Sequence, residues 1–430
     1  MRKSVNVILD ASPLGIGFYH RRARTGISRV IEQLVAGLRR SPDCQLSLAA
    51  PTHLPETMRY VADNFPTAIP FVHTAGERGV ARLENALLSP FGAESVPSKV
   101  IRRISYQTRR LTKTEYAHFQ PDQFPAQSVY HATFFPVPAV VQQRQASRTV
   151  QSIYDLIPIM HPEWFTDGEQ TVHQVLAGLL PESWVTTISQ ATKDDFCNHT
   201  NFNPDRVVPI LLAASPDLFH PVTDEKRKQA IRQRLKLGDG PYFLSLATLE
   251  PRKNIDHLIR CFGQLVASKE LSADVKLVLV GTKGWKFDAI MAEAGRNSEL
   301  MSRLVFTGFV PDEDLAPLYA GALAFAYPSL YEGFGLPPLE AMQCGLPVIT
   351  SNVSSLPEVV GDAAIQVAPK DVDGLCQAML TIAGSPSVQR GMSDKSLKRA
   401  AQFSWDKFTA EHVALYKRII ETQSQGFASI

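Results

Sequence analysis

The stretch ALAFAYPSLYEGFGLPPLEAMQCGLPVITS, residues 322–351, decides which fold the sequence predicts. It contains two short apolar runs, at residues 322–328 and 346–351, with a glycine-containing loop and a helix-forming segment between them. The helix is expected to begin at Pro337 or Pro338, because proline suits the first position of a helix. A strand, a helix and a second apolar strand in this order are typical of a parallel sheet covered on both faces.

Apolar runs of the same kind recur along the whole chain. We expect ten further strands, at residues 5–10, 45–50, 128–133, 148–156, 183–189, 207–213, 241–247, 275–281, 304–309 and 364–369. Segments with helical periodicity separate them. The clearest of these, residues 254–266, places its apolar side chains on one stripe, and Asn254 can cap its start. The pattern predicts an α/β protein with doubly wound parallel sheets.

The length of 430 residues is too great for a single compact core. We therefore predict a first domain at residues 1–213, a linker with a surface helix at 214–239, a second domain at 240–405, and a final helix at 406–430 that packs back on the first domain. Residues 52–127 are long, irregular and rich in basic side chains, and no clear element is predicted there.

The composition is that of a globular protein, with 44% hydrophobic and 20% charged residues. The net charge of +2 gives no overall signal for a polyanionic partner. The five cysteines are widely spaced without a C-x-x-C motif, which favours reduced thiols in the cytoplasm over a zinc site or a disulfide framework. The apolar run at residues 5–10 is too short for a signal peptide or a membrane span, so we expect contact with a membrane only at its surface.

The loop YEGFG, residues 331–335, is expected at the carboxyl end of a strand, where open α/β sheets bind ligands. Gly333 and Gly335 allow main-chain amides to approach a ligand closely, and the following helix start offers N–H groups to a phosphate. Glu332 and Glu340 frame this turn and can accept hydrogen bonds from sugar hydroxyls. Either glutamate alone would suit an exposed loop, but two of them around such a turn indicate a binding site.

A basic pair follows the first predicted strand of the second domain, in TLEPRKN, residues 248–254. The guanidinium of Arg252 and the ammonium of Lys253 can hold a diphosphate. One contact near ~4 Å contributes up to ~4 kcal/mol at an effective dielectric near ~20. A merely solvated basic pair is the alternative, and it is disfavoured because positive charges at a helix N-terminus oppose the helix dipole. Lys283, in the loop after the next strand, is a weaker candidate for the same phosphate.

Four positions of the first domain also follow predicted strands. Gly26, in RTGISRV, would let its loop approach a ligand closely. Tyr154 and Asp155, in SIYDLIP, end a buried strand, where the aspartate is either an active-site group or the cap of a turn. His131 ends another strand and is either a structural residue or a contact of the acceptor. These alternatives stay open at this point.

Several of these motifs together resemble the retaining glycosyltransferases of the group 1 family (GT4). The resemblance is specific for TLEPRKN, RLVFTGFVPDEDLAPLY and YPSLYEGFGLPPLEAMQCGLPVITSNVSSLPEVVGDAA, and it covers residues 240–370. RTGISRV, IYDLIPIMHPEWF and VTTISQATKDDF in the first half match more loosely. The resemblance implies the GT-B fold, in which two Rossmann-like doubly wound domains face each other across a cleft. Members with such blocks are often bacterial enzymes of lipopolysaccharide, capsule or exopolysaccharide assembly.

The resemblance also implies roles for the donor-binding residues of the second domain. Glu340 would hold the nucleotide ribose. Glu332 and the main-chain amides of Phe334 and Gly335 would face the donor sugar and the diphosphate, and Leu336 would adjoin the same site.

Further donor contacts follow from the same resemblance. Arg252 and Lys253 would neutralise the leaving diphosphate, and Gly26 would lie beside that diphosphate from the opposite domain. The nucleotide base would lie near Phe309 and Val310.

The sequence departs from the family pattern at two positions. Ala247 stands where many members have arginine, so Arg252 is expected to provide that charge alone or the diphosphate to lie differently. Tyr154 stands where many have a histidine beside the reacting sugar, and a phenol is a poor base at neutral pH. This fits a retaining mechanism in which an oxygen of the leaving phosphate takes the proton of the acceptor, with Asp155 left to position the acceptor.

Basic side chains gather in two segments of the first domain. Residues 99–114, KVIRRISYQTRRLTKT, contain six basic residues and no acidic one. They are Lys99, Arg102, Arg103, Arg109, Arg110 and Lys113, and a second group comprises His20, Arg21, Arg22 and Arg24. We expect these segments to hold a lipid-linked glycan acceptor or the inner membrane surface that contains it, and the alternative is a solvated basic loop. No nucleic-acid motif accompanies the charge, so no nucleic-acid partner is expected.

The sequence thus predicts an enzyme that moves a hexose or deoxyhexose from a nucleotide-diphosphate sugar to a lipid-linked or growing bacterial surface glycan. Mannose from GDP-mannose is the first choice, and fucose, rhamnose and glucose stay open. No paired acids suit a metal site in these loops, so we expect neither a metal nor another cofactor. The alternatives are a nucleotide-sugar epimerase on the same architecture and a catalytically silent nucleotide-sugar-binding protein.

Overall fold

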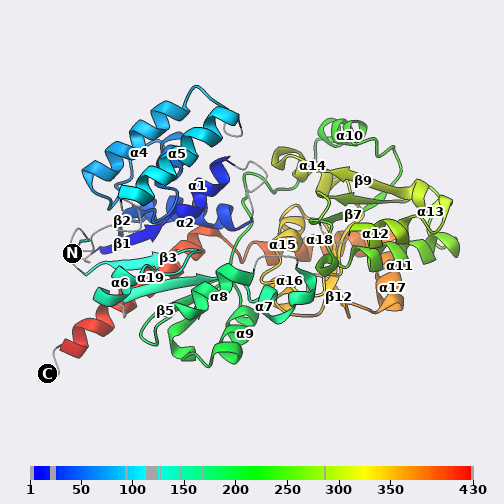
Figure 1. The fold of residues 1–430 in the computed structure, drawn as a ribbon. Coiled ribbons are helices and arrows are strands. Elements are labelled where there is room, and N and C mark those ends of the chain that lie inside the picture. Colours follow the sequence, from blue (N-terminus) through cyan, green and yellow to red (C-terminus); the bar gives the residue numbers. More distant parts are fainter. Residues whose placement is uncertain are drawn as a thin grey trace.

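Two six-stranded parallel sheets form the centres of two lobes that lie side by side (Figure 1). The computed structural model describes residues 4–19, 26–92, 95–112, 124–125, 127–145, 148–165, 169–284 and 287–427. The predicted fold class, two Rossmann-like doubly wound α/β domains, is confirmed. All twelve predicted strands are present, because each is a short apolar run that both sheet faces bury.

The N-terminal lobe contains a sheet with the strand order β2-β1-β3-β4-β5-β6. Its strands are β1 (Val5–Asp10), β2 (Cys44–Ala49), β3 (Val129–Ala132), β4 (Thr149–Ile153), β5 (Trp184–Thr187) and β6 (Val207–Pro209). Its helices are α1 (Ser12–Tyr19), α2 (Gly26–Arg40), α3 (Leu54–Asn64), α4 (Ala75–Leu88), α5 (Val96–Thr112), α6 (Ala139–Gln145), α7 (Ile157–Met160), α8 (Glu169–Ala177) and α9 (Gln190–Thr200).

The C-terminal lobe contains a sheet with the strand order β12-β11-β10-β7-β8-β9. Its strands are β7 (Tyr242–Leu246), β8 (Lys276–Val280), β9 (Leu304–Gly308), β10 (Ala324–Tyr327), β11 (Val348–Ser351) and β12 (Ile365–Val367). Its helices are α11 (Ile255–Ala267), α12 (Phe287–Ala294), α13 (Ser298–Arg303), α14 (Leu315–Ala320), α15 (Leu336–Gln343), α16 (Leu356–Val360), α17 (Val372–Ala383) and α18 (Pro386–Ala400).

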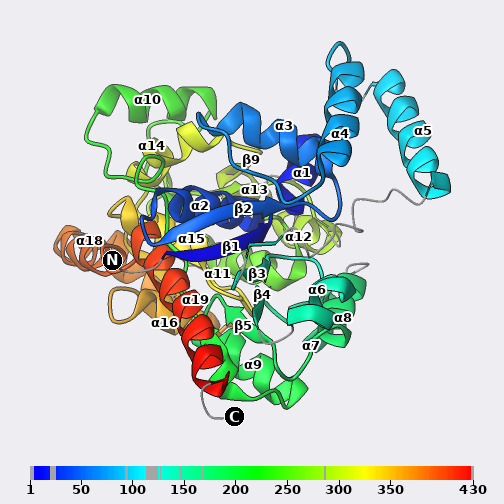
Figure 2. The same cartoon turned by 90° about the vertical axis from the view of Figure 1, so that its left-hand side faces the viewer.

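The two lobes share a continuous apolar core. One cluster of buried side chains includes Leu9 of the first sheet, Phe219 of the connecting segment and Phe325 of the second sheet. The last helix, α19 (Trp405–Phe427), runs from the C-terminal lobe back to the N-terminal lobe and packs on α2 and β1 (Figures 1 and 2). The chain therefore crosses between the lobes twice, once after β6 and once before α19.

The segment predicted as a linker contains a helix, α10 (Glu225–Arg234), that packs against α14. The guanidinium of Arg232 donates a hydrogen bond to the carbonyl of Gly321 at 3.1 Å, and Arg234 pairs with Asp314. These contacts fix the helix to the C-terminal lobe.

The expectation that residues 52–127 lack clear elements is wrong. The segment contains the three helices α3, α4 and α5. Thr74 and Glu77 form a reciprocal capping box at the start of α4, a local signal that the sequence already contains as T-x-x-E. Few apolar residues of α5 are buried, so its helical stripe does not stand out as part of a core.

Asn254 does not cap α11 in the predicted way. The residue adopts a left-handed conformation with φ of 57°, and its side chain makes no capping hydrogen bond. Its side-chain nitrogen Nδ2 donates instead to the carbonyls of Pro328 at 2.9 Å and Pro369 at 2.7 Å. Asn254 therefore joins the start of α11 to the loop after β10, beside the candidate site.

Candidate active site

The loop between β10 and α15 is fixed by its own backbone and by two serines. Gly335 has φ of 115°, a conformation that strongly favours glycine, and α15 begins at the next residue. Ser355 Oγ donates to the carbonyls of Glu332 at 2.9 Å and Phe334 at 2.6 Å. Ser354 Oγ accepts a hydrogen bond from the amide of Glu332 at 2.9 Å. The loop is thus held in one shape that directs the carboxylate of Glu332 toward β7.

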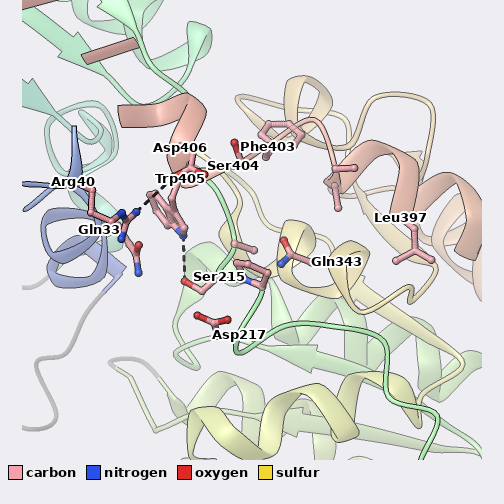
Figure 3. A pocket seen from close by; sticks show the side chains of 14 residues that line it. Gln33, Arg40, Ser215, Asp217, Gln343, Leu397, Phe403, Ser404, Trp405 and Asp406 are labelled. Atoms are coloured by element: carbon pink, nitrogen blue, oxygen red, sulfur yellow. Dashed lines mark hydrogen bonds and ion pairs between the residues drawn. The ribbon is translucent and has the colours of Figure 1, made fainter. Parts of the chain in front are cut away.

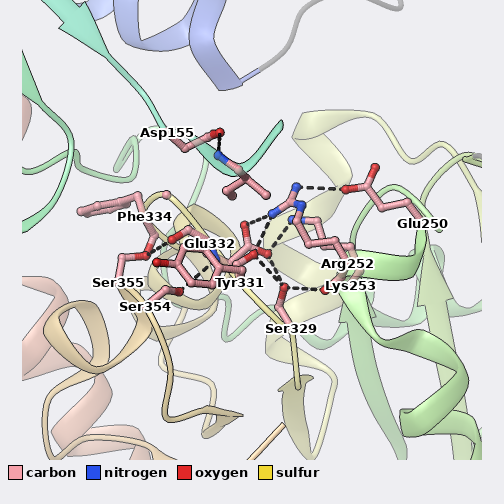
Figure 4. A network of polar contacts seen from close by, with 12 residues as sticks. Asp155, Glu250, Arg252, Lys253, Ser329, Tyr331, Glu332, Phe334, Ser354 and Ser355 are labelled. Atoms are coloured by element: carbon pink, nitrogen blue, oxygen red, sulfur yellow. Dashed lines mark hydrogen bonds and ion pairs between the residues drawn. The ribbon is translucent and has the colours of Figure 1, made fainter. Parts of the chain in front are cut away.

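Glu332 forms a buried cluster with the predicted basic pair (Figure 4). Its Oε2 lies 2.6 Å from Nη1 of Arg252, and its Oε1 lies 2.7 Å from Nζ of Lys253. The hydroxyls of Tyr327 and Ser329 also donate to Oε1, at 2.7 Å and 2.6 Å. We call Arg252, Lys253 and Glu332 the cation–carboxylate cluster. Residues from two separate sequence motifs meet here because β7 and β10 are neighbouring strands.

The charges in the cluster control its pKa values. Burial alone would raise the pKa of Glu332, but the positive charges of Arg252 and Lys253 outweigh it and lower the pKa to about 2. Burial and the neighbouring Arg252 lower the pKa of Lys253. Burial opposes the charge of Arg252 as well, yet Glu332 and Glu250 raise its pKa, and Glu250 Oε1 lies 2.9 Å from Nη2 of Arg252. Glu332 and Arg252 are therefore charged at neutral pH, and the contact with Glu332 favours the ammonium form of Lys253 against the effect of burial.

Asp155 and Tyr154, on the loop after β4, approach this cluster from the N-terminal lobe. Asp155 Oδ1 accepts a hydrogen bond from the amide of Ile157 at 3.1 Å, which is the contact of a turn cap, one of the two roles left open for this residue. Burial raises the pKa of Asp155, and the positive charge of Arg252 opposes that effect, which places the carboxyl within electrostatic reach of the cluster. Burial also raises the pKa of Tyr154, so its phenol is neutral.

Gly333 lies directly against this loop. A Cβ atom at this position would lie 2.6 Å from the carbonyl oxygen of Tyr154 and 3.0 Å from Cβ of Asp155. The hydroxyls of Ser189 and Thr192 donate to the carbonyl of Gly333 at 2.7 Å and 3.1 Å. The absence of a side chain at Gly333 therefore lets the two lobes meet beside the cluster.

Two further contacts across the lobes surround this point. The hydroxyl of Tyr331 donates to the carboxylate of Asp195 on α9, with the shorter distance at 2.8 Å. The carboxylate of Glu358 accepts from the main-chain amides of Gln190 at 2.9 Å and Ala191 at 3.1 Å, at the N-terminus of α9. A carboxylate at this helix end is favoured by the helix dipole.

Glu340 lies on α15 and is only 9% exposed at its side chain. Its Oε1 is 3.8 Å from Nη1 of Arg29 on α2, and its Oε2 accepts from the hydroxyl of Tyr319 at 3.4 Å. Burial raises the pKa of Glu340 to about 7, although Arg29 lowers it. Arg29 also pairs with Asp312, so one cation of the N-terminal lobe contacts two carboxylates of the C-terminal lobe.

The remaining donor candidates of the C-terminal lobe have different exposures. Phe309, directly after β9, is 73% exposed, whereas the side chain of Val310 is buried. Phe309 therefore presents an exposed aromatic ring, whereas Val310 belongs to the core. Lys283 is exposed after β8, with its ammonium 4.9 Å from the centre of the Phe287 ring. Its backbone forms a bridge with Leu249, which places it beside the segment that contains Arg252.

Gly26 and Leu336 lie side by side across the lobes. A Cβ atom at Gly26 would be 3.6 Å from Cδ1 of Leu336. The start of α2 therefore faces the start of α15.

His131 does not reach a site that an acceptor can enter, and the expected acceptor contact is corrected. Its side chain is fully buried, with Nδ1 2.6 Å from the hydroxyl of Tyr416 and Nε2 2.8 Å from Oγ of Ser152. Burial and the neighbouring His412 lower its pKa well below the usual value, so the ring is neutral. The structural interpretation of His131 is the one that these contacts favour.

The structure describes only some of the basic residues that were predicted for the acceptor side. Arg21 and Arg22 lie outside the described residues. Arg102, Arg103, Arg109 and Arg110 all belong to α5, so this segment is a helix and not a loop. Within the part of the chain that the structure describes, no group of three or more His, Cys, Asp or Glu residues could hold a metal ion.

A cavity of about 430 Å³ lies elsewhere, where the chain crosses between the lobes (Figure 3). Its lining residues include Gln33, Arg40, Asp217 and Trp405, and the indole nitrogen of Trp405 donates to Oγ of Ser215 at 3.2 Å. None of the predicted site residues lines it. The cavity belongs to the joint between the lobes and not to the cation–carboxylate cluster.

Several residues of the site were not singled out from the sequence, and four of them show why. Glu250 lies inside the motif TLEPRKN, Tyr327 and Ser329 lie inside YPSLYEGFG, and Arg29 lies inside RTGISRV. Their presence in these motifs was a usable signal. Their roles depend on side-chain contacts between segments far apart in the sequence, which spacing does not give.

Comparisons with known proteins agree with this geometry. Residues 226–399 match the model of the family described as "Glycosyl transferases group 1". The chain is 34% identical over 294 residues to the O-antigen chain mannosyltransferase B of Escherichia coli, and the match covers 67% of this chain and 74% of that protein. It is 32% identical over 283 residues to the serotype-specific mannosyltransferase WbdA of Escherichia coli, which covers 65% of this chain and 34% of that protein.

Solved structures show the same fold. Sucrose-phosphate synthase from Thermosynechococcus elongatus superposes with a TM-score of 0.66 at 20% sequence identity, and the match covers 97% of this chain and 100% of that chain. The arrangement of two Rossmann-like lobes is therefore the GT-B fold. With this fold, the family match and the 34% identity to a mannosyltransferase, the chain belongs to the group 1 glycosyltransferases.

Proposed function

We propose that the protein transfers a hexose or deoxyhexose, with mannose from GDP-mannose as the first choice, to a lipid-linked or growing bacterial surface glycan. The proposal depends above all on the cation–carboxylate cluster, which places two buried positive charges at the carboxyl ends of β7 and β10. The choice of mannose and of a surface glycan is supported by the names of relatives, an O-antigen chain mannosyltransferase and a serotype-specific mannosyltransferase.

The cluster suits the stabilisation of a leaving diphosphate. Negative charge grows on the diphosphate as the bond from the sugar to its phosphate oxygen breaks. Arg252 and Lys253 are already held by Glu332, so they need little rearrangement when that charge develops. The positive end of the α15 dipole adds to this charge, although Pro337 and Pro338 in the first turn have no main-chain N–H to offer. Glu332 exchanges one of its cation contacts for a hydroxyl of the donor sugar in this proposal.

The transfer is proposed to proceed with retention and without a strong enzymic base. The bond from the anomeric carbon to the phosphate oxygen breaks, and a bond to the acceptor oxygen forms on the same face of the sugar. The acceptor proton passes to the departing phosphate oxygen. Tyr154 is neutral and Asp155 already accepts a hydrogen bond from Ile157, which supports a positioning role for both in place of base catalysis.

Fixed protein charge is proposed to take the place of a divalent cation. Arg252, Lys253 and the start of α15 would together compensate the charge of the diphosphate. Turnover should therefore be unchanged after exhaustive treatment with EDTA, and a loss that Mg²⁺ or Mn²⁺ restores would contradict this part of the proposal.

A comparison of donors tests the proposed function. The protein would be incubated with GDP-mannose, GDP-fucose, dTDP-rhamnose and UDP-glucose and with a lipid-linked oligosaccharide, and the product anomer would be determined by NMR. We expect transfer of mannose with the anomeric configuration of the donor. Conversion of the donor without any acceptor would indicate an epimerase, and binding without transfer of any sugar would indicate a silent binding protein.

The comparison needs a matched pair of variants. Lys253→Ala removes a cation of the cluster and should lower turnover by about 10²-fold or more. Lys398→Ala removes an exposed cation of α18 that is not among the candidate site residues, and it should have a small effect.

A further inference from the structure

Exposed apolar side chains form a stripe on α4. Val80, Leu83 and Leu87 follow the spacing of one helix face, and Leu83 is 63% exposed. The buried residues Ala81 and Leu88 lie about 100° from Val80 and Leu87 around the helix, on a neighbouring face. The exposed stripe is thus additional to the face by which α4 packs on the protein.

A second stripe lies on α5. Val96, Val100, Ile104 and Leu111 fall within ~80° of one another around the helix at ~100° per residue, and all four are at least half exposed. The other face contains Ser98, which is buried, and Ser105, whose Oγ donates to Oε2 of Glu84 on α4 at 2.6 Å. The apolar stripe therefore points away from the contact with α4.

The charge of α5 is of one sign. The helix contains Lys99, Arg102, Arg103, Arg109 and Arg110 and no acidic residue. Lys99 and Arg103 lie ~60° and ~20° from Val96 around the helix at ~100° per residue, so they flank one edge of the apolar stripe. An exposed apolar stripe flanked by basic residues is the pattern of a helix that lies in a membrane interface.

The two helices stand out from the N-terminal lobe. Figure 2 shows α4 and α5 as a pair that extends beyond the sheet, with α5 on the outside. We call α4 and α5 together, residues 75–112, the basic helix pair. No helix among the described residues is long and apolar enough to cross a membrane.

We propose that the basic helix pair binds the surface of a membrane that contains anionic lipids. The apolar stripes would enter the interface, and Lys99 and Arg103 would contact lipid phosphates. A second copy of the chain is the less suitable occupant, because a symmetric contact through α5 would bring like charges together. A nucleic acid would cover the cations but leave the apolar stripes in water. The proposal does not depend on the identity of the sugar donor.

Vesicle co-sedimentation tests the proposal with the full chain. Vesicles of phosphatidylcholine alone would be compared with vesicles that contain about a third phosphatidylglycerol. We expect binding to the anionic vesicles that weakens as salt is raised, and little binding to the neutral ones. Equal recovery with both kinds of vesicle, or no binding to either, would overturn the proposal.

Two pairs of variants separate charge from apolar contact. Lys99→Glu/Arg103→Glu should weaken vesicle binding at least about tenfold. Lys226→Glu/Arg227→Glu makes the same change of charge on α10, another exposed helix with basic residues, and should leave binding close to wild type. Val100→Ser/Ile104→Ser should also weaken binding, whereas Met301→Ser, at an exposed apolar residue of α13, should not.

Circular dichroism and size-exclusion chromatography complete the experiment. The substituted side chains are exposed, so we expect all variants to remain folded, and we expect wild type to have the same oligomeric state as the α5 variants. A wild-type dimer that Val100→Ser/Ile104→Ser converts to a monomer, without vesicle binding by either, would show that the surface binds a second copy instead.

Discussion

Nη1 of Arg29 lies 3.8 Å from Oε1 of Glu340, although the two residues belong to different lobes. Arg29 pairs with Asp312 at the same time, so its guanidinium joins α2 to the candidate ribose site of the C-terminal lobe. The contact couples the closed arrangement of the lobes to the charge of a carboxylate that is expected to bind the donor. It gives Arg29 a role that its place in the motif RTGISRV did not reveal.

Arg29→Ala should weaken donor binding more than it slows the chemical step. The ion pair is partly exposed, so its loss is expected to raise the KM for the donor by about three- to tenfold while kcat changes less. Steady-state kinetics would measure this. Arg39→Ala, on the same helix, is the matched control and should leave both constants close to wild type. An unchanged KM in Arg29→Ala would contradict the coupling.

Glu340 should make donor affinity depend on pH. Burial raises its pKa to about 7, and a carboxylate accepts hydrogen bonds from hydroxyls better than a carboxyl group does. Affinity for the donor should therefore increase as pH rises from about 6 to about 8. Calorimetric titration would measure it. Glu340→Gln should bind more weakly, with little dependence on pH in this range, and an equally steep profile in Glu340→Gln would assign the titration to another group.

The contribution of Glu340 to the stability of the protein should decrease as pH rises, whereas the affinity for the donor increases. A carboxyl whose pKa is raised by folding stabilises the native state most below its unfolded pKa, and that contribution disappears as pH rises through about 7. Wild type should therefore lose stability relative to Glu340→Gln between about pH 5 and about pH 8. Urea unfolding at several pH values would measure the difference, and a constant difference would contradict the assigned pKa.

Glu332 should have the reverse pH dependence of stability. Its pKa is lowered to about 2, so its contribution is complete above the unfolded value near 4.5 and is lost as pH falls toward about 2. Glu332→Gln should reduce the free energy of unfolding at pH 7 by about 3–5 kcal/mol, because it leaves buried cations without their carboxylate. The gap between wild type and Glu332→Gln should narrow below about pH 5. A gap that stays constant down to pH 3 would show that Arg252 and Lys253 do not lower this pKa.

Gly333→Ala should separate the lobes. The added methyl group would lie 2.6 Å from the carbonyl oxygen of Tyr154, a distance that requires the backbone to move. We expect turnover to fall more than about tenfold and the radius of gyration in small-angle X-ray scattering to increase. At Gly79 on α4 the added group would meet nothing within 4 Å, so Gly79→Ala is the control and should keep full turnover. Normal turnover in Gly333→Ala would show that this close approach is not needed.

The sequence was sufficient to predict the strands of both sheets, because these strands are continuous apolar runs between turn residues. It also singled out Arg252, Lys253 and Glu332 as candidates, since each lies in a short motif at a strand end. It was not sufficient for the contacts among them, because a cation next to a loop can face a ligand, the solvent or a neighbouring carboxylate. The three-dimensional placement of β7 beside β10 determines which of these occurs.

The outcomes for two further residues have similar physical causes. Asparagine is a residue type that often caps helices, but the left-handed backbone at Asn254 turns its side-chain amide toward Pro328. His131 ends a strand where ligands often bind, but α19 covers it, and Tyr416 takes one of its ring nitrogens. Both outcomes depend on segments that are more than seventy residues away in the chain.

The structure of the protein with a bound nucleotide-diphosphate sugar tests the central claim most directly. A crystal soaked with GDP-mannose, or with the donor preferred in the comparison above, should contain diphosphate oxygens about 3 Å from the guanidinium of Arg252 and the ammonium of Lys253. A donor bound elsewhere, with both cations still held only by Glu332 and Glu250, would contradict the account.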